Sequence, residues 1–418
     1  MRSIHTVIIG GGQAGLAMSH CLSERSIEHV VLERARVAER WRSERWDSLR
    51  LLTPNWMSRL PGCRYEGPDP DGYMTMPEII RYLERYALLS RVPLETGANV
   101  RKLERSDTGF RVETDDRNWT ARNVVIATGY SDRPAIPPIA KQLPAGILQL
   151  SPSHYRNPGE LPDGGVLVVG AAASGIQLAD EIADAKKPVY LAVGRHLRML
   201  RRYRGNDILW WLDQMGVLEE TTDQVFDLQT SMNQPAFQLV GRPDHSTIDL
   251  AQLMAKGVRV FGRALGSDGR KVFFDDDLIA TTTSADVKLA SLLIRIDRFI
   301  DESGLKSQVG EPEPFVPLWP HFFSPSPTQL DLEAERIRTV IWATGFRRSY
   351  PWLNIPVLDE QGEIRNTRGI TPEPGLYVLG LQFQHRRKSA FIDGVGLDAV
   401  ELAEHLAERE SLRRTSVA

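Results

Sequence analysis

The feature that most constrains the fold of this chain is a glycine-rich turn close to its N-terminus. Residues 7–35 read VIIGGGQAGLAMSHCLSERSIEHVVLERA. The apolar run Thr6–Ile9 predicts a buried strand, and the stretch from Ala14 to about Glu24 predicts a helix, so that only the glycines separate the two. Strand, tight turn and helix in this order are typical of the unit that opens a dinucleotide-binding α/β domain.

The glycines of this turn have the G-x-G-x-x-G spacing, and each has a separate role. Gly10 permits the turn, Gly12 lets the backbone approach a pyrophosphate, and Gly15 lets the helix pack closely on the strand. The next apolar run ends on Glu33, 23 residues after Gly10, where a carboxylate can accept hydrogen bonds from an adenosine ribose. These parts together favour a dinucleotide site over the alternative, a glycine turn in an ordinary α/β domain.

The same pattern returns later in the chain. Residues 166–196, VLVVGAAASGIQLADEIADAKKPVYLAVGRH, again predict a strand, a small-residue turn, a helix and a strand. Two further apolar strands each end in Ala-Thr-Gly and an aromatic residue, at 127–130 and 343–346. Such a pair suits the two points where the chain leaves a host domain and re-enters it, although two unrelated buried strands are the alternative. We therefore expect an α/β protein of two Rossmann-like domains, with an irregular connection at 309–327.

Composition excludes several classes of function. The 418 residues carry a net charge of −3, which favours neither nucleic acid nor an anionic membrane as partner. No apolar run reaches the roughly 18 residues of a membrane helix and the N-terminus does not read as a signal peptide, so a cytoplasmic protein with a small-molecule ligand is expected. Only Cys21 and Cys63 occur, so no CxxC redox pair exists. The histidines show no metal-ligand spacing, and we expect no metal site. Nothing in the sequence sets an oligomeric state.

With these motifs in view, the chain resembles the class B flavin-containing monooxygenases. This group includes the plant YUCCA-type enzymes and, more distantly, the Baeyer–Villiger monooxygenases. The resemblance covers nearly the whole length. It rests on both glycine motifs and on the following segments: ERWRSERWDSLRLLTP at 39–54, IATGY at 126–130, WATGF at 342–346, GLYVLG at 375–380 and GVGLDA at 394–399.

In that family the first glycine motif binds FAD and the second binds NADPH. The resemblance therefore implies an FAD-binding domain formed by residues 1–150 and 331–418, with an NADPH-binding domain at 163–330 inserted into it. The cofactor-binding residues that it implies are, in chain order, Gly10, Gly12, Gly15, Glu33, Trp41, Ala127, Thr128, Gly129, Gly170, Ala172, Ser174, Gly175, Arg195, Ala343, Thr344 and Gly345.

Three departures from the family pattern stand out. Ala172 takes the place of the second glycine in the second motif. The linker signature of the family, in which a histidine follows phenylalanine and glycine, is degraded in LPAGILQLSPSHYRNP at 143–158, where Ser151 stands at the histidine position. The asparagine that many members keep beside the flavin is not evident, because alignment on Pro54 puts Leu52 there and Asn55 lies close by.

The strand after the second glycine motif predicts a preference for NADPH over NADH. It carries no carboxylate where Glu33 ends the first unit, and it offers Arg195 instead, with Arg198, Arg201 and Arg202 close behind. Arginine can bind a 2′-phosphate through two parallel hydrogen bonds. A solvated basic face is the alternative.

Other distinctive residues receive plainer interpretations. The pair Trp210 and Trp211 is expected in the core, and Trp41 and Trp46 are better candidates for lying near the flavin. The run HRRKS at 385–389 reads as a solvated basic loop, with contact to cofactor or substrate as the alternative.

The function implied by the resemblance is that of an NADPH-dependent FAD monooxygenase. Hydride would pass from NADPH to the flavin, which would react with O2 to give a C4a-(hydro)peroxide that transfers one oxygen atom to a small organic substrate. The protein would supply orientation and a dry cavity, so no catalytic acid, base or nucleophile is singled out. The alternatives are a flavin-dependent NAD(P)H oxidase or reductase, and a flavin-carrying redox sensor or interaction protein.

Overall fold

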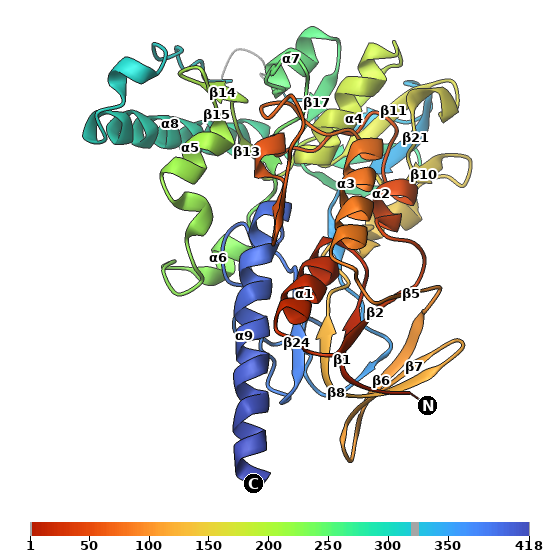
Figure 1. The fold of residues 1–418 in the computed structure, drawn as a ribbon. Coiled ribbons are helices and arrows are strands. Elements are labelled where there is room, and N and C mark those ends of the chain that lie inside the picture. The colour runs from red at the N-terminus through yellow and green to blue at the C-terminus, as the bar shows by residue number, and fades with distance from the viewer. Residues whose placement is uncertain (1, 319–325, 418) are drawn as a thin grey trace.

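Two sheets with dinucleotide-binding connectivity make up the computed structural model, which describes residues 2–318 and 326–417 (Figure 1). The irregular connection expected at 309–327 therefore lies partly outside the described residues. The first sheet has eight strands in the order β23-β6-β7-β8-β1-β2-β5, with β24 also paired to β8. Its strands are β1 Arg2–Ile9, β2 His29–Glu33, β5 Leu94–Thr96, β6 Val100–Ser106, β7 Gly109–Thr114, β8 Asn118–Ile126, β23 Leu353–Asn354 and β24 Leu376–Val378.

The second sheet has five strands, all parallel, in the order β10-β21-β11-β12-β17. Their bounds are β10 Leu148–Leu150, β11 Gly165–Val169, β12 Val189–Ala192, β17 Arg259–Phe261 and β21 Ile337–Trp342. A three-stranded antiparallel sheet covers one face, and it consists of β18 Ala264–Ser267, β19 Lys271–Phe274 and β20 Gln329–Asp331. The predicted α/β fold with two Rossmann-type domains is confirmed.

Helices bury one face of each sheet. In the first domain α1 Gln13–Glu24 packs against the C-terminal helix α9 Ile392–Val417 and against α3 Met76–Leu89. In the second domain α4 Ala173–Asp184 packs on β11 and β12 and contacts α7 Leu250–Ala255. One hydrophobic cluster runs through both helical layers, because Leu16 and Leu178 belong to the same set of contacting buried residues.

The remaining helices are set by local signals. A capping box formed by Thr75 and Glu78 starts α3. The side chain of each residue accepts the backbone N–H of the other. Asp207 caps α5 Ile208–Gln214 by accepting the Leu209 N–H, and Trp211 on this helix is fully buried, which agrees with its expected place in the core. The long helix α8 Leu278–Glu302 lies at the edge of the second domain (Figure 1).

The strand pairing moves the expected domain boundaries. Residues 148–150 and 337–342 were expected in the first domain, but β10 and β21 lie in the second sheet. The reason is that β21 pairs with β11 as β8 pairs with β1, so the second apolar strand that ends in Ala-Thr-Gly belongs to the second glycine unit. The chain crosses between the sheets through a two-stranded antiparallel ribbon of β9 Arg133–Pro134 and β22 Phe346–Arg347.

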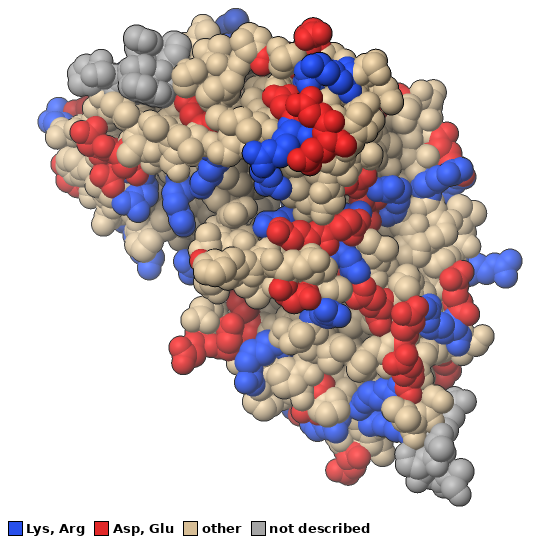
Figure 2. Space-filling view, turned by 90° about the vertical axis from the view of Figure 1, so that its left-hand side faces the viewer, with Lys and Arg blue, Asp and Glu red and all other residues tan. Residues whose placement is uncertain are grey.

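Charged side chains are mixed over the face seen in Figure 2, with acidic and basic groups side by side. Many of them form exposed pairs such as Arg85 with Glu66. Among the described residues, no helix combines the length and apolar character that a bilayer span requires.

Candidate functional site

The first glycine turn has the backbone of a phosphate-binding loop. Gly10 has φ +112°, and a Cβ there would lie 2.5 Å from the Ala127 carbonyl oxygen. A Cβ on Gly15 would lie 1.9 Å from the Gly10 oxygen, so helix α1 packs directly on the turn. By contrast, no protein atom lies within 4 Å of a Cβ placed on Gly12. The loop is therefore closed on the protein side and open where a pyrophosphate would approach.

Glu33 lies at the end of β2, beside this loop. Its Oε2 accepts the Gly11 N–H at 2.7 Å and its Oε1 accepts the Ala35 N–H at 3.0 Å. A carboxylate has about four acceptor positions, so two remain for ribose hydroxyls. The side chain is half-buried and held in place before any ligand arrives.

The second turn repeats this geometry closely. Gly170 has φ +106° and a Cβ there would lie 2.4 Å from the Ala343 oxygen, while a Cβ on Gly175 would lie 1.8 Å from the Gly170 oxygen. Ala172 has φ −77° and ψ −170°, close to the −84° and −174° of Gly12. Because these are extended values that any residue adopts, the backbone accepts alanine here. Its methyl group stands where the first loop is open.

Each loop is followed by a helix without a side-chain N-cap. Neither Gly12 at α1 nor Ala172 at α4 provides a side-chain cap, and neither helix has an acidic residue in its first turn. The first-turn N–H groups are therefore available to an anion, and the helix dipole favours one there. Ser174 lies half-buried in the first turn of α4.

The two Ala-Thr-Gly segments have the same position in each unit. Ala127 abuts Gly10, and Ala343 abuts Gly170. Each segment then turns through a glycine of positive φ, Gly129 at +79° and Gly345 at +87°, and enters the ribbon that joins the domains. Thr344 secures this junction, since its hydroxyl donates to the Ala135 carbonyl at 2.7 Å. Thr128 belongs to the corresponding first segment.

Strand register identifies the residue that replaces Glu33 in the second unit. Gly10 N–H donates to the Leu32 carbonyl, one residue before Glu33, and Gly170 N–H donates to the Ala192 carbonyl. The counterpart of Glu33 is therefore Val193, which is buried and uncharged. Arg195 follows two residues later, exposed and without a partner in the described part of the chain. This strand end therefore lacks the carboxylate that would repel a 2′-phosphate.

The expectation that further arginines lie ready beside Arg195 is wrong for two of them. Arg198 is buried and forms ion pairs with Asp286 at 2.7 Å and Asp249 at 3.0 Å. Arg201 is fully buried, pairs with Asp207 at 2.5 Å and donates to the Leu52 carbonyl at 2.8 Å. Internal carboxylates thus occupy both guanidinium groups, and Arg201 connects the second domain to the loop around Leu52. Arg202 is exposed.

The segment at 39–57 lies between α1 and the second domain. Trp46 is buried in the main core, whereas Trp41 is half-buried and lies under the Arg45 guanidinium at 5.4 Å. Asn55 is almost fully buried, with its amide nitrogen donating to the Asp69 carbonyl and its oxygen accepting the Met74 N–H. Asn55 is thus used to hold the loop and does not replace the missing asparagine.

The run at 385–389 is not a solvated loop, contrary to its simplest interpretation. Residues 385–388 pair with 218–222 of the second domain, and we call this contact the latch. Backbone bonds run from Thr222 N–H to His385, from Arg387 N–H to Glu220 and from Lys388 N–H to Leu218. Local sequence spacing could not predict these partners, because they lie more than a hundred residues away.

An ion-pair cluster completes the latch at the start of α9. Lys388 is buried and lies 2.8 Å from Asp393 and 2.5 Å from Glu219. Burial opposes the charged form of Lys388, yet its hydrogen bonds with Asp393 and Glu219 raise its pKa above the ordinary value. The lysine is therefore charged and joins the two domains beside the N-terminus of α9.

The cysteines take no part in these sites. Cys21 is buried on α1, where burial raises the pKa of its thiol to about 12, and Cys63 is free on β4 Cys63–Arg64. A thiol with so high a pKa is a poor nucleophile near neutral pH.

Comparisons with known proteins agree with this geometry. The family model for pyridine nucleotide-disulphide oxidoreductases matches residues 7–207. An uncharacterized CzcO-like oxidoreductase of Geobacillus kaustophilus is 34% identical over 95% of this chain and 96% of its own length. Probable indole-3-pyruvate monooxygenase YUCCA1 of Arabidopsis thaliana is 33% identical over 47% of this chain and 48% of its own.

Solved structures share the fold. A flavin-containing monooxygenase from Stenotrophomonas maltophilia superposes with a TM-score of 0.67 at 20% sequence identity, covering 98% of this chain and 99% of the other.

Proposed function

This chain belongs to the CzcO-like oxidoreductases of the class B flavin-containing monooxygenase family, and from that premise we propose that it is an NADPH-dependent FAD monooxygenase. It is a flavin-dependent oxidoreductase that also uses a nicotinamide cofactor. Its proposed reaction uses O2 and adds one oxygen atom to a small organic substrate. We propose FAD as the flavin, NADPH as the nicotinamide cofactor, and oxygen transfer as the reaction.

The observation that supports the proposal most is the repetition of one loop geometry in two sheets. Each sheet has a glycine turn closed against an Ala-Thr-Gly segment and followed by an uncapped helix. Two such loops in one chain fit two dinucleotides. FAD suits the first loop, because it has both the pyrophosphate for Gly12 and the ribose for Glu33.

We assign a separate set of residues to each cofactor. Gly10, Gly12, Gly15 and Glu33 would hold FAD, together with the α1 N-terminus. Gly170, Ala172 and Gly175 would hold the NADPH pyrophosphate, and Arg195 its 2′-phosphate. When bound, the flavin supplies hydride acceptance and reaction with O2. The protein would orient both cofactors and exclude water from the reacting atoms.

A simpler oxidase or reductase is a second candidate, and one observation favours it. The asparagine typical of many members is absent, and the Asn55 amide is already bonded to backbone on both sides. A flavin without that group could return its electrons to O2 as hydrogen peroxide.

Stoichiometry separates the two candidates. We would measure NADPH consumption, product and hydrogen peroxide with a sulfide, a tertiary amine and a ketone as probes: thioanisole, N,N-dimethylbenzylamine and phenylacetone. The monooxygenase predicts that one probe accelerates NADPH consumption and yields an oxygenated product in equal amount. One peroxide released per NADPH with every probe would instead establish the oxidase.

A further inference from the structure

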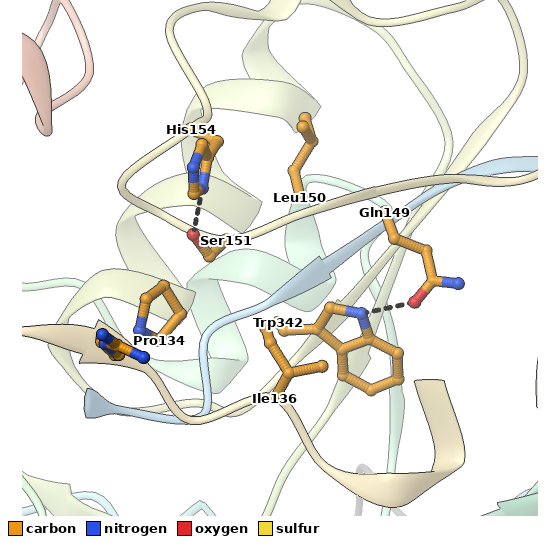
Figure 3. A pocket seen from close by; sticks show the side chains of 8 residues that line it. Pro134, Ile136, Gln149, Leu150, Ser151, His154 and Trp342 are labelled. Carbon is orange, nitrogen blue, oxygen red and sulfur yellow. Dashed lines mark hydrogen bonds between the residues drawn. The ribbon is translucent and has the colours of Figure 1, made fainter. Parts of the chain in front are cut away.

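A cavity of about 430 Å³ lies where the ribbon meets the carboxyl ends of β10 and β21 (Figure 3). Neither glycine loop contributes to its lining. The lining residues are Arg133, Pro134, Ile136, Gln149, Leu150, Ser151, His154 and Trp342. In parallel α/β sheets, ligands bind outside the carboxyl ends of the strands. This size and position suit a small molecule.

One part of the cavity is apolar. Ile136 is exposed and lies beside Trp342, and Leu150 lines another part of the cavity (Figure 3). The Trp342 indole N–H already donates to the Gln149 side-chain oxygen at 2.9 Å. Its polar atom is therefore satisfied. Because Trp342 is only 2% exposed, the apolar contact with a ligand comes mainly from Ile136.

The other part carries an unneutralised positive charge. Arg133 is exposed and has no carboxylate partner among residues 2–318 and 326–417. The adjacent carboxylate of Asp132 is already paired with Arg40. Arg133 is thus a free guanidinium at the edge of a cavity.

A second free arginine lies directly opposite the first. Arg347 on β22 pairs in register with Arg133 on β9, so both side chains leave the same face of the ribbon. Arg347 is exposed, and the described chain provides no partner for it either, because the nearby Glu363 is bound by Arg348. Like charges at directly opposed positions destabilise a strand pair. An anion between the two guanidinium groups would remove that repulsion.

Further hydrogen-bonding groups adjoin this charge. Ser151 Oγ lies 2.8 Å from His154 Nδ1 and 2.8 Å from Ser153 Oγ. Figure 3 shows the His154 ring and Ser151 at the side of the cavity away from Trp342. His154 is exposed, and its Nε2 has no partner in the described chain. The imidazole can therefore contribute one more hydrogen bond to a ligand.

From this juxtaposition we infer that the cavity binds a small carboxylic acid with an apolar body. The carboxylate lies at Arg133, with Arg347 adding charge and His154 adding a hydrogen bond. The carbon skeleton lies against Ile136, the exposed apolar side chain of the lining. This ligand site goes beyond the proposed reaction, and its existence does not depend on oxygen transfer.

The test uses a matched pair of ligands on the flavin-loaded protein. We would titrate 3-phenylpropionate and its neutral amide, 3-phenylpropionamide, by calorimetry at low salt. The acid is expected to bind about 10- to 150-fold more tightly, the range of one charge-assisted hydrogen bond. Arg133→Gln should reduce that ratio to near one, and Arg347→Gln should reduce it partly.

A charge control and a competition complete the design. Arg298 on α8 is also exposed and has no charged partner in the described chain. Helix α8 lies at the opposite edge of the second domain from β10 (Figure 1), so Arg298→Gln should leave the ratio unchanged. Equal binding of acid and amide would overturn the inference. So would an equal loss in Arg298→Gln, or complete displacement of the acid by saturating NADPH, which would assign the anion site to the nucleotide.

Discussion

Gly12 and Gly146 are matched glycines, since neither has a protein atom within 4 Å of a Cβ position and neither has a positive φ. We expect Gly12→Val to lower bound flavin at least about tenfold, because the side chain fills the space left for the pyrophosphate. Gly146→Val, in an open loop, should keep its flavin. The ratio of flavin to protein absorbance after purification gives the result. Equal flavin content in both variants would contradict the assignment of FAD to the first loop.

At the same scale, our proposal assigns the choice of nicotinamide cofactor to Arg195. We expect Arg195→Ala to lower the ratio of kcat/KM for NADPH to that for NADH by about 10- to 150-fold, because a charge-assisted bond to the 2′-phosphate is lost. Arg202→Ala removes an exposed arginine of the same segment and should leave the ratio unchanged. An equal effect of both changes would favour a diffuse basic face instead.

Among elements, the latch makes the clearest prediction. Lys388→Met should cost about 3 kcal/mol of unfolding free energy, because Asp393 keeps its charge in a buried position with one partner fewer. Arg36→Ala, which breaks an exposed pair with Glu39, should leave the unfolding free energy almost unchanged. Urea unfolding followed by tryptophan fluorescence measures both. Equal values would mean that Lys388 is effectively solvated.

The elements also divide into those that the sequence predicts and those that it does not. The glycine turns could be predicted, because the spacing from Gly10 to Gly15 and from Gly170 to Gly175 lies within one strand-turn-helix unit. Lys388 and Arg201 could not, since their partners Glu219 and Leu52 are brought close only by the packing of two domains. The spacing of residues within one segment does not predict a contact between two domains.

For the whole molecule, buried histidines predict a loss of stability in mild acid. Burial lowers the pKa of His29 and of His196. Their neutral forms are favoured in the folded state, so they stabilise it above the unfolded pKa near 6.5, and this contribution falls as the pH drops toward the folded pKa. Each adds a slope of up to about 1.4 kcal/mol per pH unit.

Unfolding free energies between pH 7.5 and 5 would check this slope. The double change His29→Gln with His196→Gln should flatten the curve, and His154→Gln, at an exposed histidine, should not. A slope that persists in the double variant would assign the effect to carboxyl groups.

The ribbon of β9 and β22 has a consequence for how such a protein can be taken apart. Pro134 and Phe346 are paired neighbours, so the entry and exit of the inserted segment lie side by side. Cutting the chain at these points leaves adjacent ends on both pieces, and a two-residue hairpin turn could close the gap left in the first domain. In genetic terms, residues 135–345 form a cassette with touching ends, which could be transplanted between hosts or circularly permuted without a long linker.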